Sequence, residues 1–258
     1  MDYEKFKSLS KLNSNEFEKI CHDYLITKKI ISINFFGKLY RGRLFDETQS
    51  INNVSEISYI PNPEWVKGYG RANKIGQPIF YCAESFNTIF FESMIIRNGQ
   101  PPTQRERLIF GEWLTKEPLK LVIIIQPDKN IRKGFFETQY GDSFDNIASN
   151  NSEVLETMKF LYRVYSERAK ENIDYILPST LSNYFYKMFD GILYPSLPFT
   201  NGGYNIALKP NVKESKLKIN KVIMNTFIWE QINKNTISDN GELIEAKLID
   251  LLTGEVLW

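Results

Sequence analysis

The chain of 258 residues is long enough for one large domain or two small ones. Its 32 Lys and Arg nearly balance its 31 Asp and Glu, so bulk charge gives no reason to expect binding to nucleic acid or to a membrane surface. Hydrophobic residues make up 42% of the chain, which is enough for a core and argues against disorder. No apolar run is long enough to cross a bilayer, and the start of the sequence lacks the apolar region of a signal peptide.

The scarcity of histidine and cysteine limits the chemistry. Cys21 and Cys82 form no CxxC pair, so we expect reduced thiols packed as small hydrophobic groups in a cytoplasmic protein. The single histidine, His22, excludes sites that need two histidines, and we expect no metal. Any chemistry should therefore use carboxylate, arginine, tyrosine and hydroxyl groups.

Helices are predicted where apolar residues recur at helical spacing. Asn13 can cap a helix over residues 13–26, in which His22 lies off the apolar stripe and should be exposed to solvent. Ser85 can cap a second helix that runs to about Arg97. Two further helices follow the same pattern: Glu153–Lys170 and Thr180–Phe189.

Strands are predicted by apolar and β-branched runs between turn residues. They are Ile30–Phe36, Lys38–Phe45, Pro78–Ala83, Leu119–Ile125, Ile192–Tyr194 and Tyr204–Lys209, with Lys216–Ile228 and Ala246–Leu252 in the tail. Residues 46–70 are predicted as loop, and residues 128–152 as polar and irregular. Because helices and strands mix without a regular βαβ rhythm, we expect a single compact α+β domain.

A few polar residues stand out in these elements. Arg41 and Arg43 alternate along a strand, Arg71 follows a glycine in a loop, and Glu92 sits in a largely apolar helix. A buried Glu92 would need a partner, and the arginines are the available ones. Arginine also suits phosphate, so this set fits an anionic ligand with aromatic rings, such as a nicotinamide or adenine dinucleotide. Taken alone, each residue is more typical of a solvated strand, loop or helix surface than of a site.

Two sequence blocks, taken in order, resemble the RES domain family, which is named for its Arg, Glu and Ser. Neither a GxGxxG nor a GxxxxGK[ST] motif is present, so no Rossmann or P-loop pattern competes with this interpretation. The resemblance spans about residues 38–212. The blocks are Gly70-Arg71-Ala72-Asn73-(x)2-Gly76-(x)-Pro78-Ile79-Phe80-Tyr81-Cys82-Ala83-Glu84-Ser85-(x)2-Thr88-Ile89-(x)2-Glu92 and Asp190-Gly191-Ile192-Leu193-Tyr194-Pro195-Ser196, followed by Gly203-(x)-Asn205-Ile206-Ala207-Leu208.

The resemblance implies a fold similar to ADP-ribosyltransferases, with mixed or antiparallel sheets flanked by helices and a cleft for NAD. It implies a bacterial toxin that cleaves the nicotinamide–ribose bond of NAD by hydrolysis, or by phosphorolysis with inorganic phosphate as co-substrate. The partner it implies is a helix-turn-helix antitoxin, which would be a separate protein because this chain contains no such segment. Two alternatives remain open: transfer of ADP-ribose to a protein or other acceptor, and a non-catalytic NAD-binding module.

The resemblance also assigns site residues by position in the two blocks. Glu92 would hold a ribose hydroxyl or stabilise the developing cation, Arg71 would hold phosphate, and Ser196 would hydrogen-bond the ribose or a phosphate. The first-strand arginine matches Arg41 best, with Arg43 as a rival. The remaining binding candidates are Tyr81, which would stack on a ring, and Asn73, Tyr194 and Asn205.

Several segments depart from the family pattern, since the chain is longer than a compact RES toxin. We expect a helical extension at 1–30, the RES domain at 31–215 and a strand-rich extension at 216–258 that packs on the same domain. Residues 98–118 and 128–152 are also extra or diverged. These segments can replace antitoxin contacts, gate the cleft or form the interface of a homo-oligomer.

Overall fold

The structure is a computed structural model that describes residues 3–10, 14–45, 49–95, 105–199, 202–233, 236–239 and 242–258. The described strands are β1 (Ser32–Phe35), β2 (Lys38–Phe45), β3 (Phe80–Ala83), β4 (Arg105–Thr115), β5 (Leu119–Ile123), β6 (Gly191–Pro195), β7 (Tyr204–Leu208), β8 (Leu217–Asn233), β9 (Thr236–Asp239), β10 (Glu242–Glu245), β11 (Leu248–Ile249) and β12 (Val256–Leu257). The described α-helices are α1 (Tyr3–Leu9), α2 (Ser14–Leu25), α3 (Phe86–Ile95), α4 (Phe135–Ser149), α5 (Ser152–Ser166), α6 (Ile176–Phe185) and α7 (Pro210–Lys216).

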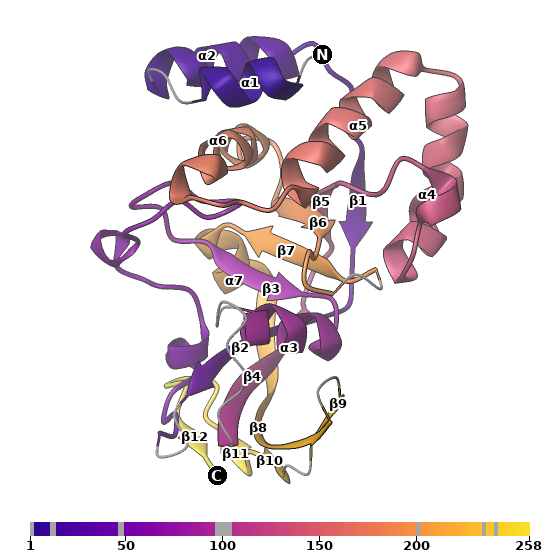
Figure 1. The fold of residues 1–258 in the computed structure, drawn as a ribbon. Helices are drawn as coiled ribbons and strands as arrows, with labels where there is room; N and C mark the ends of the chain where they lie inside the picture. Colours follow the sequence, from indigo (N-terminus) through magenta and orange to yellow (C-terminus); the bar gives the residue numbers. More distant parts are fainter. Residues whose placement is uncertain are drawn as a thin grey trace.

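One large sheet connects the two halves of the molecule (Figure 1). Its strand order is β1-β5-β6-β7-β3-β2-β4-β8-β10, with β9 paired to β8, and the short β11–β12 hairpin lies outside it. Neighbouring strands in that order are antiparallel except for the parallel β5–β6 pair. This mixed arrangement of helices around a mostly antiparallel sheet confirms the expected α+β class.

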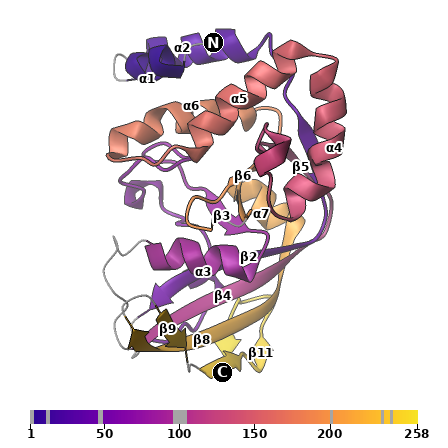
Figure 2. The same cartoon turned by 45° about the vertical axis from the view of Figure 1, so that its right-hand side comes forward.

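The helices lie on the sheet in two groups (Figures 1 and 2). Helices α5 and α6 pack on β6, while α1 contacts α5 and α2 contacts α6 as an outer layer. Helix α3 packs on β2 and β3, well below α5 and α6 in both views. No helix in the described part of the chain is long and apolar enough to span a membrane.

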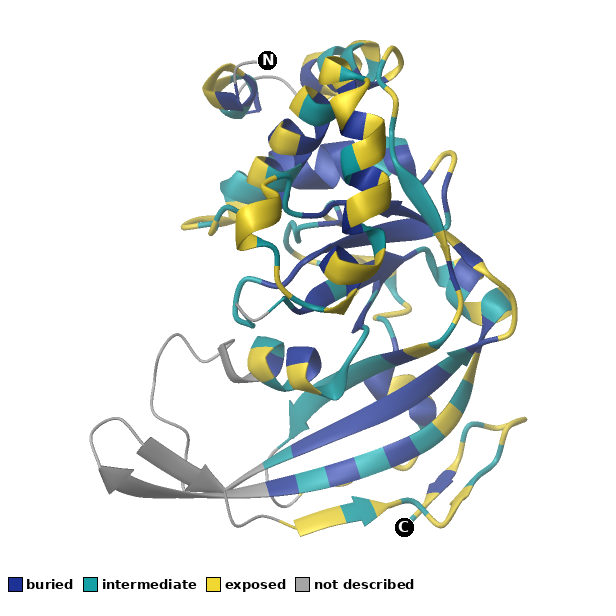
Figure 3. Cartoon of the chain, turned by 90° about the vertical axis from the view of Figure 1, so that its right-hand side faces the viewer, coloured by how far each residue is buried: buried dark blue, intermediate teal, exposed yellow. Residues whose placement is uncertain are grey.

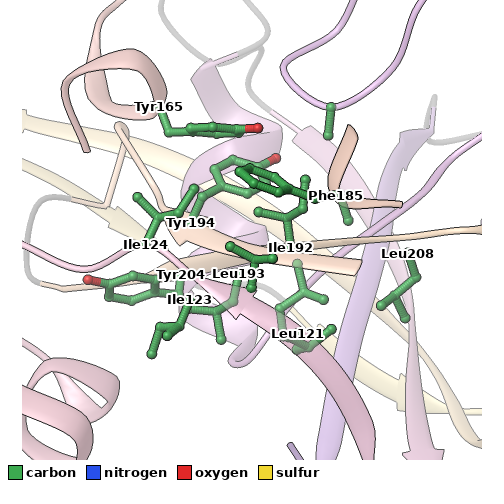
Figure 4. Packing of buried hydrophobic residues seen from close by; sticks show 14 of the residues in the cluster. Leu121, Ile123, Ile124, Tyr165, Phe185, Ile192, Leu193, Tyr194, Tyr204 and Leu208 are labelled. Carbon is green, nitrogen blue, oxygen red and sulfur yellow. The ribbon is translucent and has the colours of Figure 1, made fainter. Parts of the chain in front are cut away.

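The central strands β5, β6 and β7 form the core. Their residues are almost all buried because helices and loops cover them, which explains why they occur as continuous apolar runs. Figure 4 shows Tyr165 of α5 and Phe185 of α6 packed over side chains of this sheet, including Tyr194 and Ile192. The outer helices instead alternate buried and exposed faces, as Figure 3 shows.

Most predicted elements are confirmed, with different ends. The helix predicted over 13–26 is α2, and the helix predicted to start at Ser85 is α3, whose first turn is capped because Ser85 Oγ accepts the N–H of Thr88 at 3.2 Å. Asn13 and Arg97 lie outside the described residues. Strands predicted on either side of Gly37 are β1 and β2, but β1 pairs with β5 whereas β2 pairs with β3 and β4.

The prediction that residues 128–152 are irregular is wrong, because α4 occupies Phe135–Ser149. Its buried face consists of widely spaced residues, including Phe136, Phe144 and Ala148. Gly141 and the polar residues beside it have low helix propensity and obscure that face in the sequence. Tertiary packing against α5 therefore overrides the weak local signal.

Two helix boundaries also differ from prediction. Helix α5 ends at Ser166 rather than Lys170, so residues 167–170 leave the helix. Helix α6 begins at Ile176 rather than Thr180, because Pro178 is tolerated in the first helical turn. It ends at Phe185. The earlier end of α5 bears on the candidate site, because residues 167–170 run along a pocket.

The least expected strands are β4 and the full length of β8. Strand β4 falls in the stretch 98–118 that we took as extra or diverged, yet it pairs along its length with both β2 and β8. The tail strand predicted at Lys216–Ile228 begins at Leu217 and continues to Asn233, while the one predicted at Ala246–Leu252 shortens to Leu248–Ile249. The expected boundary at residue 215 thus falls within α7, and β8 belongs to the same sheet as the rest.

Candidate functional site

A pocket of about 930 Å³ is lined by strands from the middle of the sheet, by α3 and by the segment that follows α5. Its size is at the upper end of the range typical of ligand sites. Strands β2, β3, β6 and β7 contribute to its lining. Six residues predicted from sequence line it together: Arg41, Arg71, Tyr81, Glu92, Tyr194 and Asn205.

The carboxylate of Glu92 is held by side chains from the neighbouring ends of β6 and β7. Ser196 Oγ donates to Glu92 Oε1 at 2.8 Å, and Asn205 Nδ2 donates to the same oxygen at 2.5 Å. Antiparallel pairing of Tyr194 with Asn205 brings these two donors side by side at the ends of β6 and β7. Ser196 therefore acts from behind Glu92 rather than in the lining, and no described hydrogen bond uses Glu92 Oε2.

Glu92 is only partly buried, and no described arginine pairs with it. No ion pair joins Glu92 to a described cation, and its partners are a hydroxyl and an amide. The pairing register of β6 and β7 brings this hydroxyl and this amide to Glu92, and no local sequence pattern indicates that register. Neutral donors orient the carboxylate without cancelling its charge, so the negative charge remains available to a ligand.

Helix α3 packs close to the sheet because Gly42 of β2 has no side chain. A Cβ atom there would lie 2.9 Å from Ile89 Cγ2, so only glycine allows this close approach of α3 to β2. Glu84 then ties the start of α3 to β7: its carboxylate accepts the N–H of Tyr204 at 3.0 Å and the hydroxyl of Thr88 at 2.9 Å. Burial raises the pKa of Glu84 to about 7.

Arg41 and Arg43 point to the same side of β2 and share a partner. Arg41 Nη2 and Arg43 Nη2 both donate to the carbonyl of Ser58, at 3.0 and 2.9 Å, and Arg41 Nη1 donates to the carbonyl of Tyr81 at 2.5 Å. Only Arg41 lines the pocket, so the structure distinguishes the two candidates. Arg41 Nε is buried without a hydrogen-bond partner.

The two guanidinium groups carry positive charge that no described carboxylate neutralises within 4.0 Å. Burial, with a contribution from the charge of Arg43, lowers the pKa of Arg41 to about 10, and burial also lowers the pKa of Arg43. Two like charges this close in a partly buried position favour an anion nearby.

Arg71 sits at the C-terminal end of α5. Its Nη1 donates to the carbonyls of Tyr165 and Glu167, at 2.9 and 3.1 Å, which are among the carbonyls that a helix end leaves without partners. Its guanidinium also lies over the ring of Tyr175, 5.5 Å from the centroid. No hydrogen bond to a described residue uses Nε or Nη2, so both remain available to a ligand.

Tyr81 and Asn73 shape the loop that carries Arg71. The Tyr81 hydroxyl donates to Asn73 Oδ1 at 2.8 Å and accepts the N–H of Ala72 at 2.9 Å, and burial raises its pKa. A Cβ at Gly70 would lie 2.2 Å from Asn73 Oδ1, so this tight loop requires glycine. Asn73, which we expected to bind ligand, is buried behind the lining and donates to the carbonyls of Gly68 and Lys74.

Tyr194 forms part of the pocket floor. It is 4% exposed, and its ring lies 5.6 Å from that of Tyr165 with a tilt of 45°. Burial raises its pKa well above the ordinary tyrosine value. A protonated, rigid ring at this position offers an apolar surface for a planar ligand group.

Sequence reasoning missed four polar lining residues: Tyr69, Ser93, Arg168 and Tyr175. Arg168 was not recognised as a candidate because the predicted helix Glu153–Lys170 includes it. Tyr69 lies between two glycines, which is a signal that could have marked it. Asn172 fastens it in place by accepting the N–H of Tyr69 at 3.1 Å and donating to its carbonyl at 3.0 Å. With Arg168, the described lining holds three arginines and one carboxylate.

The described residues contain no group of three or more His, Cys, Asp or Glu side chains that could hold a metal ion. Both cysteines are free and buried. Comparison with models of protein families gave no match, and comparison with curated proteins gave no significant match. The functional conclusion therefore depends on the geometry of the pocket and on the resemblance of the two sequence blocks.

Proposed function

We propose that this protein cleaves the nicotinamide–ribose bond of NAD in a fold related to that of ADP-ribosyltransferases. One observation carries the proposal: a single pocket brings Glu92, held by Ser196 and Asn205, together with Arg41 and Arg71, which have no described carboxylate partner. A dinucleotide offers matching groups, since it has a pyrophosphate for the arginines, a ribose for the carboxylate and planar rings for tyrosines.

The reaction chemistry fits this inventory. When the bond between the ribose C1′ and the nicotinamide nitrogen breaks, its electron pair leaves with nicotinamide, which departs as a neutral molecule. No acid is needed to protonate the leaving group, so the absence of a histidine from the pocket lining is no obstacle. The ribose acquires oxocarbenium character, which a nearby carboxylate stabilises.

Glu92 is the proposed catalytic residue. Its Oε1 is occupied by two hydrogen bonds, so Oε2 would contact a ribose hydroxyl or face the developing positive charge at C1′. A water oxygen, or an oxygen of inorganic phosphate, then forms the new bond to C1′, and the attacking water releases one proton. Hydrolysis yields ADP-ribose, whereas phosphorolysis yields ADP-ribose 1″-phosphate.

The arginines would bind rather than react. Arg71 offers Nε and Nη2 to pyrophosphate oxygens, and Arg41 adds the positive charge of a second lining guanidinium. Tyr69 and Tyr175 lie beside Arg71 in the lining and offer rings for stacking. As a toxin of this kind, the protein would be restrained by a separate antitoxin that covers the pocket.

The test is a time course of NAD with purified protein, with and without phosphate, analysed by chromatography that resolves nicotinamide, ADP-ribose and its 1″-phosphate. We expect nicotinamide release, and we expect Glu92→Gln to lower its rate by about 10³-fold, as for loss of one preorganised stabilising group. Wild-type rates retained by a folded Glu92→Gln variant would refute the assignment.

Two other outcomes would favour the alternative functions. Label from NAD that ends on a protein instead of on free ADP-ribose would indicate ADP-ribosyl transfer. Tight NAD binding without nicotinamide release from folded protein would indicate a binding module.

A further inference from the structure

The N-terminal helix α1 forms hydrogen bonds with Glu167, the residue just before Arg168 of the pocket lining. Lys7 Nζ donates to Glu167 Oε1 at 2.6 Å, and the hydroxyl of Tyr3 donates to Oε2. The backbone carbonyl of the same residue accepts a hydrogen bond from Arg71 Nη1 at 3.1 Å. Glu167 therefore connects α1 to Arg71, a pocket arginine that lies 96 positions before Glu167 in the sequence.

The contact between α1 and Glu167 is built around a carboxylate. Burial would raise the pKa of Glu167, but the hydrogen bonds from Lys7 and Tyr3 outweigh burial and lower it. The hydrogen bond to Glu167 in turn raises the pKa of Lys7. Such charge-assisted bonds are shorter and stronger than neutral ones, so the Glu167 backbone is held at a defined position.

Little free space separates α1 from the pocket wall. A cavity of only about 10 Å³ lies between them, with Tyr3 and Lys7 on one side and Arg71, Arg168 and Tyr175 on the other. Because α5 ends at Ser166, the segment that carries Arg168 is not fixed by helical hydrogen bonds. At its far end, the N–H groups of Lys170 and Glu171 donate to Asp174, whereas at its near end Glu167 provides the contact with α1.

We propose that Glu167 is a positioning residue through which α1 sets the affinity of the pocket for the anionic part of its ligand. It fixes the carbonyl that holds Arg71 and the path of Arg168 along the pocket. Glu167 is absent from the pocket lining, so its effect should fall on binding rather than on bond cleavage. Naming the ligand as NAD rests on the proposed function above, whereas the coupling of α1 to Arg71 does not.

A simpler explanation is that α1 only adds stability by burying Tyr3 and Phe6, which are 7% and 5% exposed. The chain offers a matched control for it. Arg163 Nη2 donates to Glu4, which forms a second ion pair between α1 and α5. Glu4→Gln weakens the same helix contact without touching Glu167 or the carbonyls that hold Arg71.

The experiment compares full-length Glu167→Gln and Glu4→Gln with the wild type. Hydrogen exchange is measured for residues 68–73, ADP affinity by calorimetry, and NAD turnover by nicotinamide release. In Glu167→Gln we expect faster exchange in that loop, a Kd for ADP and a KM for NAD raised about fivefold, and a kcat within about twofold, as for one weakened charged hydrogen bond. Glu4→Gln should change none of these.

Equal effects of the two variants, or no change in exchange for Glu167→Gln, would overturn the positioning role. A fall in kcat at constant KM would also overturn it, because that would place Glu167 in the chemical step. If the wild type releases no nicotinamide, the proposed function fails, yet the exchange comparison still decides whether α1 positions Arg71 through Glu167.

Discussion

The hydroxyl of Ser196 donates to the carboxylate of Glu92 at 2.8 Å, although 104 positions separate the two residues in the sequence. The bond links the residue that follows β6 to α3, and both elements contribute residues to the pocket lining. Asn205 donates to the same oxygen from β7. The β6–β7 pair therefore decides the orientation of Glu92.

Removal of the Ser196 hydroxyl should weaken catalysis without abolishing it. Ser196→Ala leaves the bond from Asn205, so we expect kcat for NAD cleavage to fall about tenfold, the effect of one charged hydrogen bond, with KM little changed. Ser93→Ala is the control, since Ser93 also lines the pocket but makes no described hydrogen bond to Glu92. Equal losses in both variants would contradict a special role for Ser196.

Arg41 and Arg43 should differ in function despite their shared partner. Arg41→Ala removes a guanidinium charge from the pocket lining, so we expect ADP affinity to fall about tenfold, as for the loss of one charged contact. Arg43→Ala removes a side chain outside the lining and should change affinity less than about twofold by the same reasoning. Calorimetric titration with ADP measures both, and a larger effect of Arg43 would reverse the assignment.

Glu84 should make stability depend on pH. Its pKa is raised by burial to about 7 in the fold, above its ordinary value of 4.5, so its favourable contribution is complete below about pH 4.5 and is lost as pH rises through 7. Glu84→Gln removes this dependence and keeps an acceptor for Tyr204. Between pH 5 and pH 8, the variant should gain about 2 kcal/mol of unfolding free energy relative to the wild type.

Denaturant unfolding of wild type and Glu84→Gln at the two pH values measures this difference. A constant difference between the two proteins across that range would mean that Glu84 does not titrate there. If the wild type instead gains unfolding free energy relative to Glu84→Gln as the pH rises, the predicted direction of the effect is wrong. The hydrogen bonds of the carboxylate would then stabilise it more than burial destabilises it.

Gly42→Ala should displace α3. The added Cβ would lie 2.9 Å from Ile89 Cγ2 and 3.1 Å from Leu108 Cδ1, so packed side chains must move. We expect a loss of about 1–3 kcal/mol in unfolding free energy, and a loss of NAD cleavage as Glu92 moves with its helix. At Gly37 the nearest atom to a new Cβ is Phe35 Cζ at 3.4 Å, so Gly37→Ala should leave both properties nearly unchanged.

Local signals in the sequence placed many of the elements correctly. The Ser85 cap located α3, and the apolar run beginning at Leu119 located β5, because capping and apolar periodicity act between neighbours in the chain. The two sequence blocks also selected five residues that line one pocket, and the first-strand arginine Arg41 is a sixth. Residue type and order alone thus gave the α+β class and most of the candidate site.

Contacts between residues far apart in the sequence determined the features of the site that local sequence signals do not predict. Strand register gave Glu92 its partners Ser196 and Asn205, and the packing of β2 placed Arg41, not Arg43, in the pocket. The end of α5 at Ser166 released the segment that carries Arg168, which the helical pattern had hidden. Such contacts depend on the free energy of packing distant segments, and that quantity is not encoded in any short window of the sequence.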